Sequence, residues 1–212
     1  SMRVGYFTIH TATGNVSMRD MAVPGDRAAL YTSMLALPAS GGTPNLTAVK
    51  HIGEQFKRTD SGAPIALSCQ KNAGMLFTDG FSNEAESAPA VTGLGAPFDN
   101  TPANSMAAIA SQYYFDAAGG VSPLRTDLTA GNVPVPDQCA TLAQTDIAWK
   151  RLDCQKNLHM NFYGVTLGGR GDVFNPDIDQ DPYLLNPAWP GYTANSRSTV
   201  DDIWHATVNT RG

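Results

Sequence analysis

Two oxygen-bearing side chains stand in loops that adjoin apolar segments. Thr43 lies in a Gly-Gly-Thr loop directly before a helical pattern, and Asp79 lies in a Thr-Asp-Gly turn at the end of an apolar run. Ligands of an open α/β sheet bind beyond the carboxyl ends of its strands, so we expect the two loops to meet there. A hydroxyl and a carboxylate are hard-oxygen ligands that suit Mg²⁺ or Ca²⁺. The pattern predicts a partial cation site containing Thr43 and Asp79.

A second group of carboxylates is Asp177, Asp179 and Asp181 in the run Asp-Ile-Asp-Gln-Asp, which resembles the start of a calcium loop. The EF-hand pattern requires Gly at its sixth position and Glu at its twelfth. This chain has Pro182 and Ala188 there. A solvated, turn-forming run is therefore the better interpretation, and a calcium site of another kind is the alternative.

The tripeptide Arg170-Gly171-Asp172 has the sequence of an integrin-type adhesion motif. Gly169 before it and the loop after it favour exposure of the tripeptide. Such a short motif also arises by chance. Binding of a host receptor through these three residues is kept as a hypothesis.

One pair of residues suggests catalysis. Asp202 and His205 lie three residues apart on an expected terminal helix, a spacing at which an acid/base pair can touch. Together with Asp79 they would form the active site of a secreted metal-assisted hydrolase if all three converged in one cleft. The alternative is that Trp204 and His205 dock the helix, and His159 is likewise more typical of a packed histidine. The sequence has no Gly-x-Ser-x-Gly elbow, Walker loop or zinc spacing, so we do not expect an enzyme.

The three cysteines allow one internal disulfide. Cys139 and Cys154 flank a loop rich in Pro and Asp, and we favour them as the pair. The rival is Cys69 with Cys154, because each opens the same Cys-Gln-Lys-Asn tetrapeptide ahead of an apolar run. Starts of neighbouring parallel strands lie within bridging distance. A surface rich in Asn and Asp suggests export, where a disulfide would persist.

Composition excludes several classes of protein. The chain has 212 residues with 42% hydrophobic residues, enough for one ordinary domain with a core. The net charge of −5 argues against a nucleic-acid partner. No apolar run approaches the length of a membrane span, and we expect no signal peptide at the start of the chain. The 20 Gly and 14 Pro residues predict many turns and long loops.

Hydrophobic patterns predict strands that alternate with helices. Strands are expected over Arg3–His10, Ala73–Thr78 and His159–Leu167, and helices over Asp26–Leu37, from Pro44 to about Arg58, over Ser105–Asp116 and over Asp201–Asn209. Thr43 fits the cap of the second helix. No regular element is expected over Arg170–Thr199. The fold class is therefore α/β, a mainly parallel sheet flanked by helices, with long irregular loops.

An ordered set of these motifs resembles a known family. The set runs from Gly41-Gly-Thr-Pro44 through Cys69-Gln-Lys-Asn72 and Met75-Leu-Phe-Thr-Asp79-Gly80 to a terminal segment, Asp201-Asp-Ile-Trp-His-Ala-Thr-Val-Asn-Thr-Arg-Gly212. It resembles the von Willebrand factor A-like region of the type IV pilus tip-associated adhesin and biogenesis factor family (PilY/PilC). The resemblance spans nearly the whole chain, residues 1–212, as a single truncated domain. Residues 170–212 then form a loop-rich segment that leads, in the family, toward a C-terminal β-propeller.

The resemblance implies a metal-ion-dependent adhesion site in which Thr43 is the second-loop ligand and Asp79 the third-loop ligand. The family's first loop, Asp-x-Ser-x-Ser, is absent here; Thr11 and Thr13 form the nearest hydroxyl cluster, without a leading Asp. The simplest explanation is a chain that begins after the family's first strand and helix. We expect weak or absent Ca²⁺ or Mg²⁺ in this fragment. The missing strand also leaves a gap, in which the flanking strands pair directly or something else intervenes.

The function implied by the resemblance is non-enzymatic surface adhesion and pilus assembly. The implied partners are pilus subunits or minor pilins, with a host surface receptor or matrix in addition. The implied location is the bacterial cell surface, at the pilus tip or outer membrane, reached by export through the periplasm. The alternatives are the secreted metal-assisted hydrolase described above and a purely structural spacer for the propeller.

Overall fold

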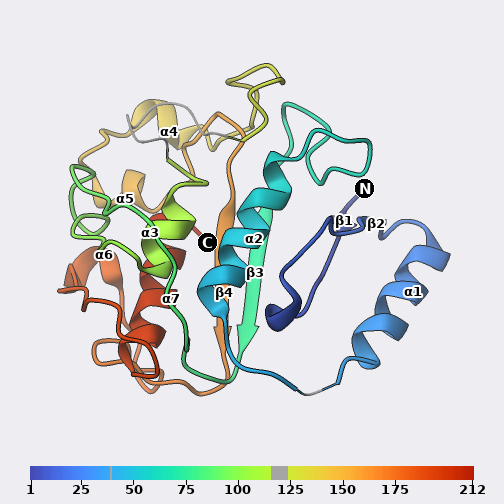
Figure 1. The fold of residues 1–212 in the computed structure, drawn as a ribbon. Coiled ribbons are helices and arrows are strands. Elements are labelled where there is room, and N and C mark those ends of the chain that lie inside the picture. Colours follow the sequence, from blue (N-terminus) through green and yellow to red (C-terminus); the bar gives the residue numbers. More distant parts are fainter. Residues whose placement is uncertain (39, 116–123) are drawn as a thin grey trace.

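The computed structural model describes residues 1–38, 40–115 and 124–212. Its few short strands are separated by one or more helices, with long connections between the elements (Figure 1). In chain order they are β1 (Arg3–Val4), η1 (Ile9–Thr11), β2 (Arg19–Asp20), α1 (Pro24–Leu35), α2 (Asn45–Lys57), β3 (Ala73–Thr78), α3 (Met106–Ser111), α4 (Gln138–Thr141), α5 (Ile147–Lys150), β4 (Asn161–Thr166), α6 (Pro182–Leu185) and α7 (Ser198–Asn209).

The parallel pair of β3 and β4 lies at the centre of the fold. Ala73 pairs with Asn161 and Thr78 pairs with Thr166, so the two strands run in register over their full lengths. The prediction of a strand over 73–78 is confirmed to the residue, and the one over 159–167 is confirmed with a residue or two less at each end. The expected mixture of helices with a parallel sheet is therefore present, as a two-stranded sheet.

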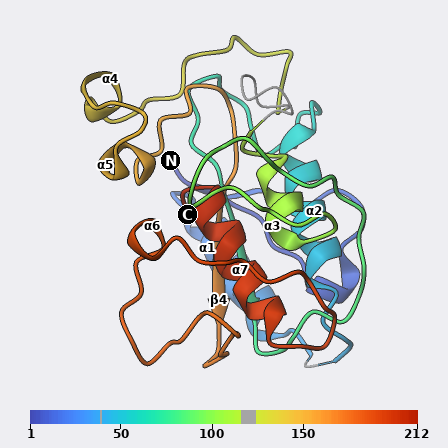
Figure 2. The same cartoon turned by 90° about the vertical axis from the view of Figure 1, so that its left-hand side faces the viewer.

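Three helices cover one face of this pair. The helix α2 packs on β3, α7 packs on β4, and α3 contacts both helices. Figure 2 shows α2, α3 and α7 on the same side of β4. The core between these layers contains side chains with 0% exposure, among them Phe162, Met160, Met106, Leu46 and Val49. The helix stripe predicted from Leu46 and Val49 therefore does face the core, where burial of apolar surface stabilises the fold.

Close approach of α7 to β4 depends on a glycine. A Cβ atom placed on Gly164 would lie 2.1 Å from Cγ2 of Ile203, far inside van der Waals contact. The same holds where α2 meets the residues after α3, because a Cβ on Gly53 would lie 2.2 Å from the ring of Tyr113. Hydrogen in place of a side chain lets each helix sit close to its neighbour.

The opposite face of β3 is open. Burial alternates along this strand, with Leu76 3% exposed toward the helices and Phe77 64% exposed on the other side. Met75 and Tyr163, which pair across the two strands, also lie on the open face. Parallel sheets normally carry helices on both faces, so this layer is one-sided. Within the described residues, no strand pairs with the second edge of β3.

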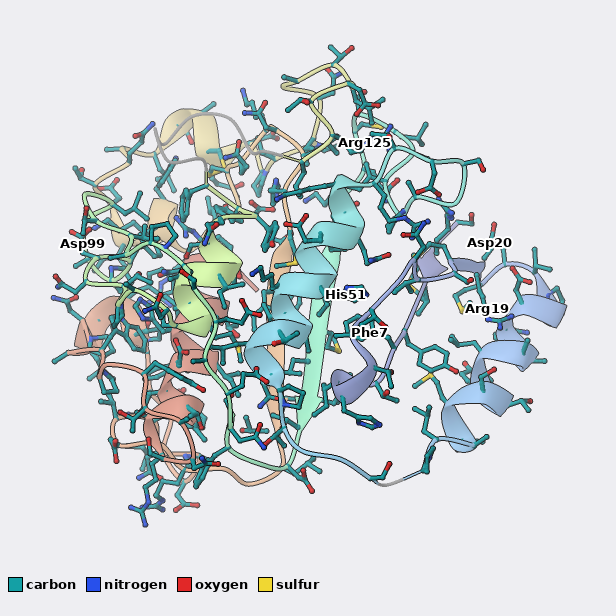
Figure 3. All side chains as sticks on the ribbon, in the orientation of Figure 1. Phe7, Arg19, Asp20, His51, Asp99 and Arg125 are labelled. Carbon is teal, nitrogen blue, oxygen red and sulfur yellow. A yellow bond between two sulfur atoms is a disulfide. The ribbon has the colours of Figure 1, made fainter. Side chains whose placement is uncertain are left out.

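The prediction of a strand over Arg3–His10 is wrong beyond Val4. Only Arg3 and Val4 form a ladder, antiparallel to β2, and residues 9–11 turn into η1. Phe7 and η1 contact α2, and Ile9 packs against the core without joining the sheet. The ring of Phe7 meets the ring of His51 edge to face, with centroids 4.7 Å apart (Figure 3). Direct pairing of this segment with β3, one of the two expected ways to close the sheet, does not occur.

Several boundaries also differ from the pattern. The first helix is shifted by two residues toward the N-terminus, and α7 begins at Ser198, three residues before its predicted start. The helix predicted over 105–116 is present as the shorter α3, and its last predicted residue, Asp116, lies outside the described residues. The stretch expected to lack regular structure, 170–199, contains α6 and the first two residues of α7. In the described ranges, no helix has the length and apolarity needed to cross a membrane.

We predict that Gly164→Ala lowers the free energy of unfolding by about 1–3 kcal/mol, because the added methyl group overpacks the contact between β4 and α7. Urea denaturation followed by circular dichroism measures the change. The matched control is Gly191→Ala, since a Cβ at Gly191 meets nothing within 4 Å. Equal unfolding free energies for the two variants would contradict the packing argument.

Candidate functional site

The loop before α2 and the loop after β3 meet at the carboxyl end of the parallel pair. The hydroxyl of Thr43 donates to the carbonyl of Phe81 at 2.5 Å, and the backbone N–H of Asn83 donates to the carbonyl of Thr43 at 3.2 Å. A Cβ on Gly80 would lie 3.0 Å from Cγ2 of Thr43. Asp79, the residue before Gly80, is exposed. The two predicted ligands therefore stand in loops that touch.

Buried polar side chains support this rim. The amide nitrogen of Asn45, the first residue of α2, donates to the hydroxyls of Ser82 at 3.1 Å and Thr78 at 3.4 Å. The hydroxyl of Thr78 donates in turn to the carbonyl of Gly80 at 3.1 Å. These bonds tie the end of β3 to the start of α2. The Oδ1 atom of Asn45 is buried without a hydrogen-bond partner in the described chain.

The start of α2 is capped differently from the prediction. Thr43 is not the cap, because the helix begins one residue later, at Asn45, and its N-cap residue, Pro44, makes no side-chain cap bond. The carboxylate of Glu84 takes this role from the loop after β3. Its Oε1 accepts the backbone N–H groups of Leu46 and Thr47 at 2.5 and 3.0 Å. Burial raises the pKa of Glu84, against the favourable effect of these N–H groups.

A divalent cation needs more than this rim supplies. Ca²⁺ takes six to eight oxygen ligands, and Mg²⁺ demands near-octahedral geometry. The rim offers the exposed carboxylate of Asp79 and the hydroxyl of Thr43, which already donates to a carbonyl. Across the described residues, no group of three or more His, Cys, Asp or Glu side chains could hold a metal ion. These residues alone do not fit a resident cation.

The acidic run after β4 is divided between two arginines. Asp177 forms an ion pair with Arg170. Asp181 forms an ion pair with Arg151 and also caps α6 by accepting the backbone N–H of Tyr183 at 3.1 Å. Asp179 is exposed. The structure therefore gives two of the three carboxylates a cationic partner within the chain.

The Arg170-Gly171-Asp172 loop is fixed by a buried carboxylate. Asp201, in the first turn of α7 and 0% exposed, accepts the backbone N–H groups of residues 172, 173 and 174 at 2.7–3.0 Å. Gly171 is buried against this carboxylate, since a Cβ there would lie 2.0 Å from its Oδ1. Arg170 and Asp172 on either side are exposed. The loop thus presents a cationic and an anionic residue on a fixed backbone.

The residues of the hydrolase hypothesis are not assembled. Asp202 is buried and accepts the backbone N–H groups of Met106 and Ala107 at 2.6 and 3.0 Å, so it caps the start of α3. His205 is buried, stacked on Trp189 at 4.0 Å between ring centroids, and lies 3.3 Å from the hydroxyl of Thr101. Asp79 is exposed, so the three do not line one accessible cleft. Both residues dock α7, as the alternative interpretation proposed for His205.

The favoured disulfide is confirmed. Cys139 and Cys154 are bonded, with Cα atoms 5.6 Å apart, and Cys69 is exposed and unpaired. The rival pairing is wrong because the strand register places Ala73 opposite Asn161. Extended backwards by four residues, that register would set Cys69 opposite residue 157, three positions away from Cys154.

His159 is packed, as expected. It is 1% exposed, and its Nε2 lies 3.0 Å from the carboxylate of Asp153. The same carboxylate accepts the hydroxyl of Tyr114 at 2.8 Å. This buried network joins the disulfide loop to the segment after α3.

Comparison with known proteins identifies the class: the chain is a distant homologue of bacterial type IV pilus biogenesis factors. The particular protein it matches is the type IV pilus biogenesis factor PilY1. PilY1 of Pseudomonas aeruginosa strain PAK is 27% identical over 208 residues, covering 83% of this chain and 17% of that protein. PilY1 of strain PAO1 is 28% identical over 205 residues, with the same shares covered. No protein-family model and no solved structure matches.

The chain thus spans about a sixth of the length of the curated relatives it matches, 17% in both cases. The shared sequence covers most of this chain. The matched proteins are pilus factors by name, and neither is named as an enzyme.

We predict that burial of His205 makes the fold sensitive to acid. Burial lowers the pKa of His205 from 6.5 to about 3, so the unfolded state binds the proton more readily. The stabilisation is complete above pH 6.5 and is lost as the pH falls toward 3, by about 2–3 kcal/mol between pH 7 and pH 4.5. Asp202 acts in the opposite direction. Burial raises its pKa from 3.8 to about 7, so its contribution falls as the pH rises between these two values and opposes that of His205 over the same interval.

Urea unfolding at pH 7 and at pH 4.5 tests this difference. His205→Gln should lose less stability than the natural chain between these two pH values, whereas His10→Gln, at an exposed histidine, should lose as much as the natural chain. An identical pH dependence for the natural chain and His205→Gln would refute the prediction.

Proposed function

We propose that this chain is a non-enzymatic adhesion and assembly module of a type IV pilus-associated protein. The observation that carries the proposal is the homology to PilY1 over 83% of the chain. Its partners would be pilus subunits or minor pilins, and its place the bacterial surface, at the pilus tip or outer membrane. The segment 170–212 would lead into a further domain, as the resemblance to the PilY/PilC family implies.

A von Willebrand factor A-like fold is part of the proposal. It is supported by the parallel pair β3–β4, by the helices packed on it, and by two loops that touch at the carboxyl ends of the strands. The open face and unpaired edge of β3 are consistent with a sheet that has lost a strand and its covering helix.

For adhesion we propose that Thr43 and Asp79 belong to a Ca²⁺ or Mg²⁺ site whose other ligands come from outside this chain. Asp79 supports this role because it is exposed and its carboxylate forms no ion pair among the described residues. The contact of Thr43 with Phe81 keeps its hydroxyl oxygen beside the same loop. The carboxylates of Asp177, Asp179 and Asp181 are a weaker candidate, because two of them already pair with arginine.

A second adhesive surface is proposed at Arg170, Gly171 and Asp172, with a host receptor or matrix protein as the partner. The supporting observation is the three N–H bonds to Asp201, which hold the backbone in one conformation while Arg170 and Asp172 remain exposed. A preorganised loop loses less conformational entropy on binding.

We predict that Asp79→Ala, introduced into the protein as the bacterium makes it, lowers cation-dependent adhesion about tenfold, a loss of about 1.4 kcal/mol in binding. Thermal stability should stay unchanged because the side chain is exposed. Counting adherent cells with and without a chelator measures the effect. The matched control is Asp137→Ala, another exposed aspartate, which lies directly before α4 and away from the rim (Figure 1).

Adhesion that is unaffected by both the chelator and Asp79→Ala would remove the cation-site proposal. If Arg170→Ala also had no effect on adhesion, the remaining interpretation would be that the chain is a purely structural spacer. A loss with Arg170→Ala alone would instead assign adhesion to the Arg170-Gly171-Asp172 loop.

A further inference from the structure

A buried guanidinium near the end of the chain has no carboxylate partner. The side chain of Arg211 stacks over the ring of Phe98 at 3.7 Å, with the rings of Tyr114 and Phe115 at 5.2 and 5.4 Å. Its Nη1 donates to the carbonyl of Asn209 at 2.6 Å, and its Nε is buried without a partner. Among the described residues it forms no ion pair. Aromatic faces offset part of the cost of burying this charge, and an unmatched donor adds to it.

The acidic group in the neighbourhood is already engaged. Asp153 accepts the hydroxyl of Tyr114 at 2.8 Å and lies 3.0 Å from Nε2 of His159. Both of its oxygens therefore have partners other than Arg211. A buried cation without an anion of its own favours an anion from outside the chain.

Arg211 lines a cavity of about 310 Å³. This volume falls at the lower end of the range typical of small-molecule sites. Its walls include the aromatic residues Phe98, Phe115 and Trp149, together with Gln144 and Lys150. The described residues that line it include two cationic side chains and no acidic one. The ammonium of Lys150 donates to the carbonyl of Ala96 at 2.6 Å, which keeps it at the wall.

We propose that this cavity binds a carboxylate that is attached to an apolar or ring-bearing group. The planar guanidinium of Arg211 lines the cavity and matches a carboxylate in shape and charge. Lys150 adds a second positive charge, and Phe115 and Trp149 provide apolar walls for the remainder of the ligand. A free carboxyl terminus of a peptide and a small aromatic acid share this chemistry.

The cavity is separate from the rim that holds Thr43 and Asp79. Arg211 follows α7, and the next residue, Gly212, packs on the backbone of Phe162 at the start of β4. The rim lies at the other end of the strands, after Thr78. Binding in the cavity therefore does not depend on the proposed cation site.

Calorimetry and the fluorescence of Trp149 test the proposal with N-acetylphenylalanine as the probe. The free acid should bind at least about tenfold tighter than its amide, which has the same shape without the charge. Lys150→Met should weaken binding of the acid about fivefold. Arg211→Lys should weaken it about tenfold or more, because the planar guanidinium with its paired N–H donors is lost while the positive charge is kept. The control Lys71→Met removes the same charge at an exposed lysine outside the cavity and should leave the affinity unchanged.

Three outcomes would overturn the proposal. Equal affinities for the acid and the amide would assign the cavity to apolar binding alone. No heat and no fluorescence change up to about 10 mM would exclude a carboxylate site of useful strength. Inorganic phosphate binding as tightly as the acid would define an unspecific anion site. If Arg211→Lys fails to fold, as judged by circular dichroism, the acid–amide comparison and Lys150→Met still decide.

A carboxyl-terminal peptide distinguishes the two sources of the ligand. A tripeptide that ends in phenylalanine should bind at least as tightly as N-acetylphenylalanine if the natural ligand is a peptide terminus. A tighter fit of the small acid, with loss of affinity for the tripeptide, would assign the cavity to free small molecules within the same proposal.

Discussion

The in-register parallel pairing of β3 and β4 is the constraint on which the rest of the fold depends. It joins two segments separated by more than eighty residues, Ala73–Thr78 and Asn161–Thr166, and sets both of their carboxyl ends at one rim. Parallel strands require a long crossover, and here α3 and the disulfide loop lie within it. The core forms on the side where α2, α3 and α7 cover the pair.

Two consecutive buried carboxylates attach α7 to different parts of this framework. Asp201 accepts three backbone N–H groups of the loop after β4, while Asp202 accepts two at the start of α3. Neighbouring residues on a helix point about 100° apart, so one turn of α7 reaches both elements. The backbone N–H groups offset part of the cost of burying these carboxylates, although desolvation still raises the pKa of Asp202. This arrangement gives both aspartates structural roles.

The local sequence pattern was enough to predict most of the secondary structure and part of the site. The strand at 73–78 was predictable because an apolar run is closed by Asp-Gly, and the Cys139–Cys154 pair because both cysteines flank one loop. The strand predicted over residues 3–10 was wrong because the segment packs on α2, as the contact of Phe7 with His51 shows. Nothing in the local sequence of the segment indicates this contact. The capping role of Glu84 was missed for the same reason: it acts on a helix 37 and 38 residues away in the chain. No sequence pattern indicated a binding role for Arg211, because its aromatic neighbours come together only in the folded chain.

The helix α7 connects the two regions for which binding is proposed, the Arg170-Gly171-Asp172 loop and the cavity lined by Arg211. It runs antiparallel to β4: Val200 lies near Gly169, Ile203 against Gly164, and Gly212 beyond its end against Phe162. Its first turn therefore holds the Arg170-Gly171-Asp172 loop at the carboxyl end of the strand, and the residue Arg211 after its last turn faces the cavity at the other end. Because Gly164 lets the helix sit directly on the strand, both regions are positioned by one rigid contact. Displacement of α7 would therefore disturb the loop and the cavity together.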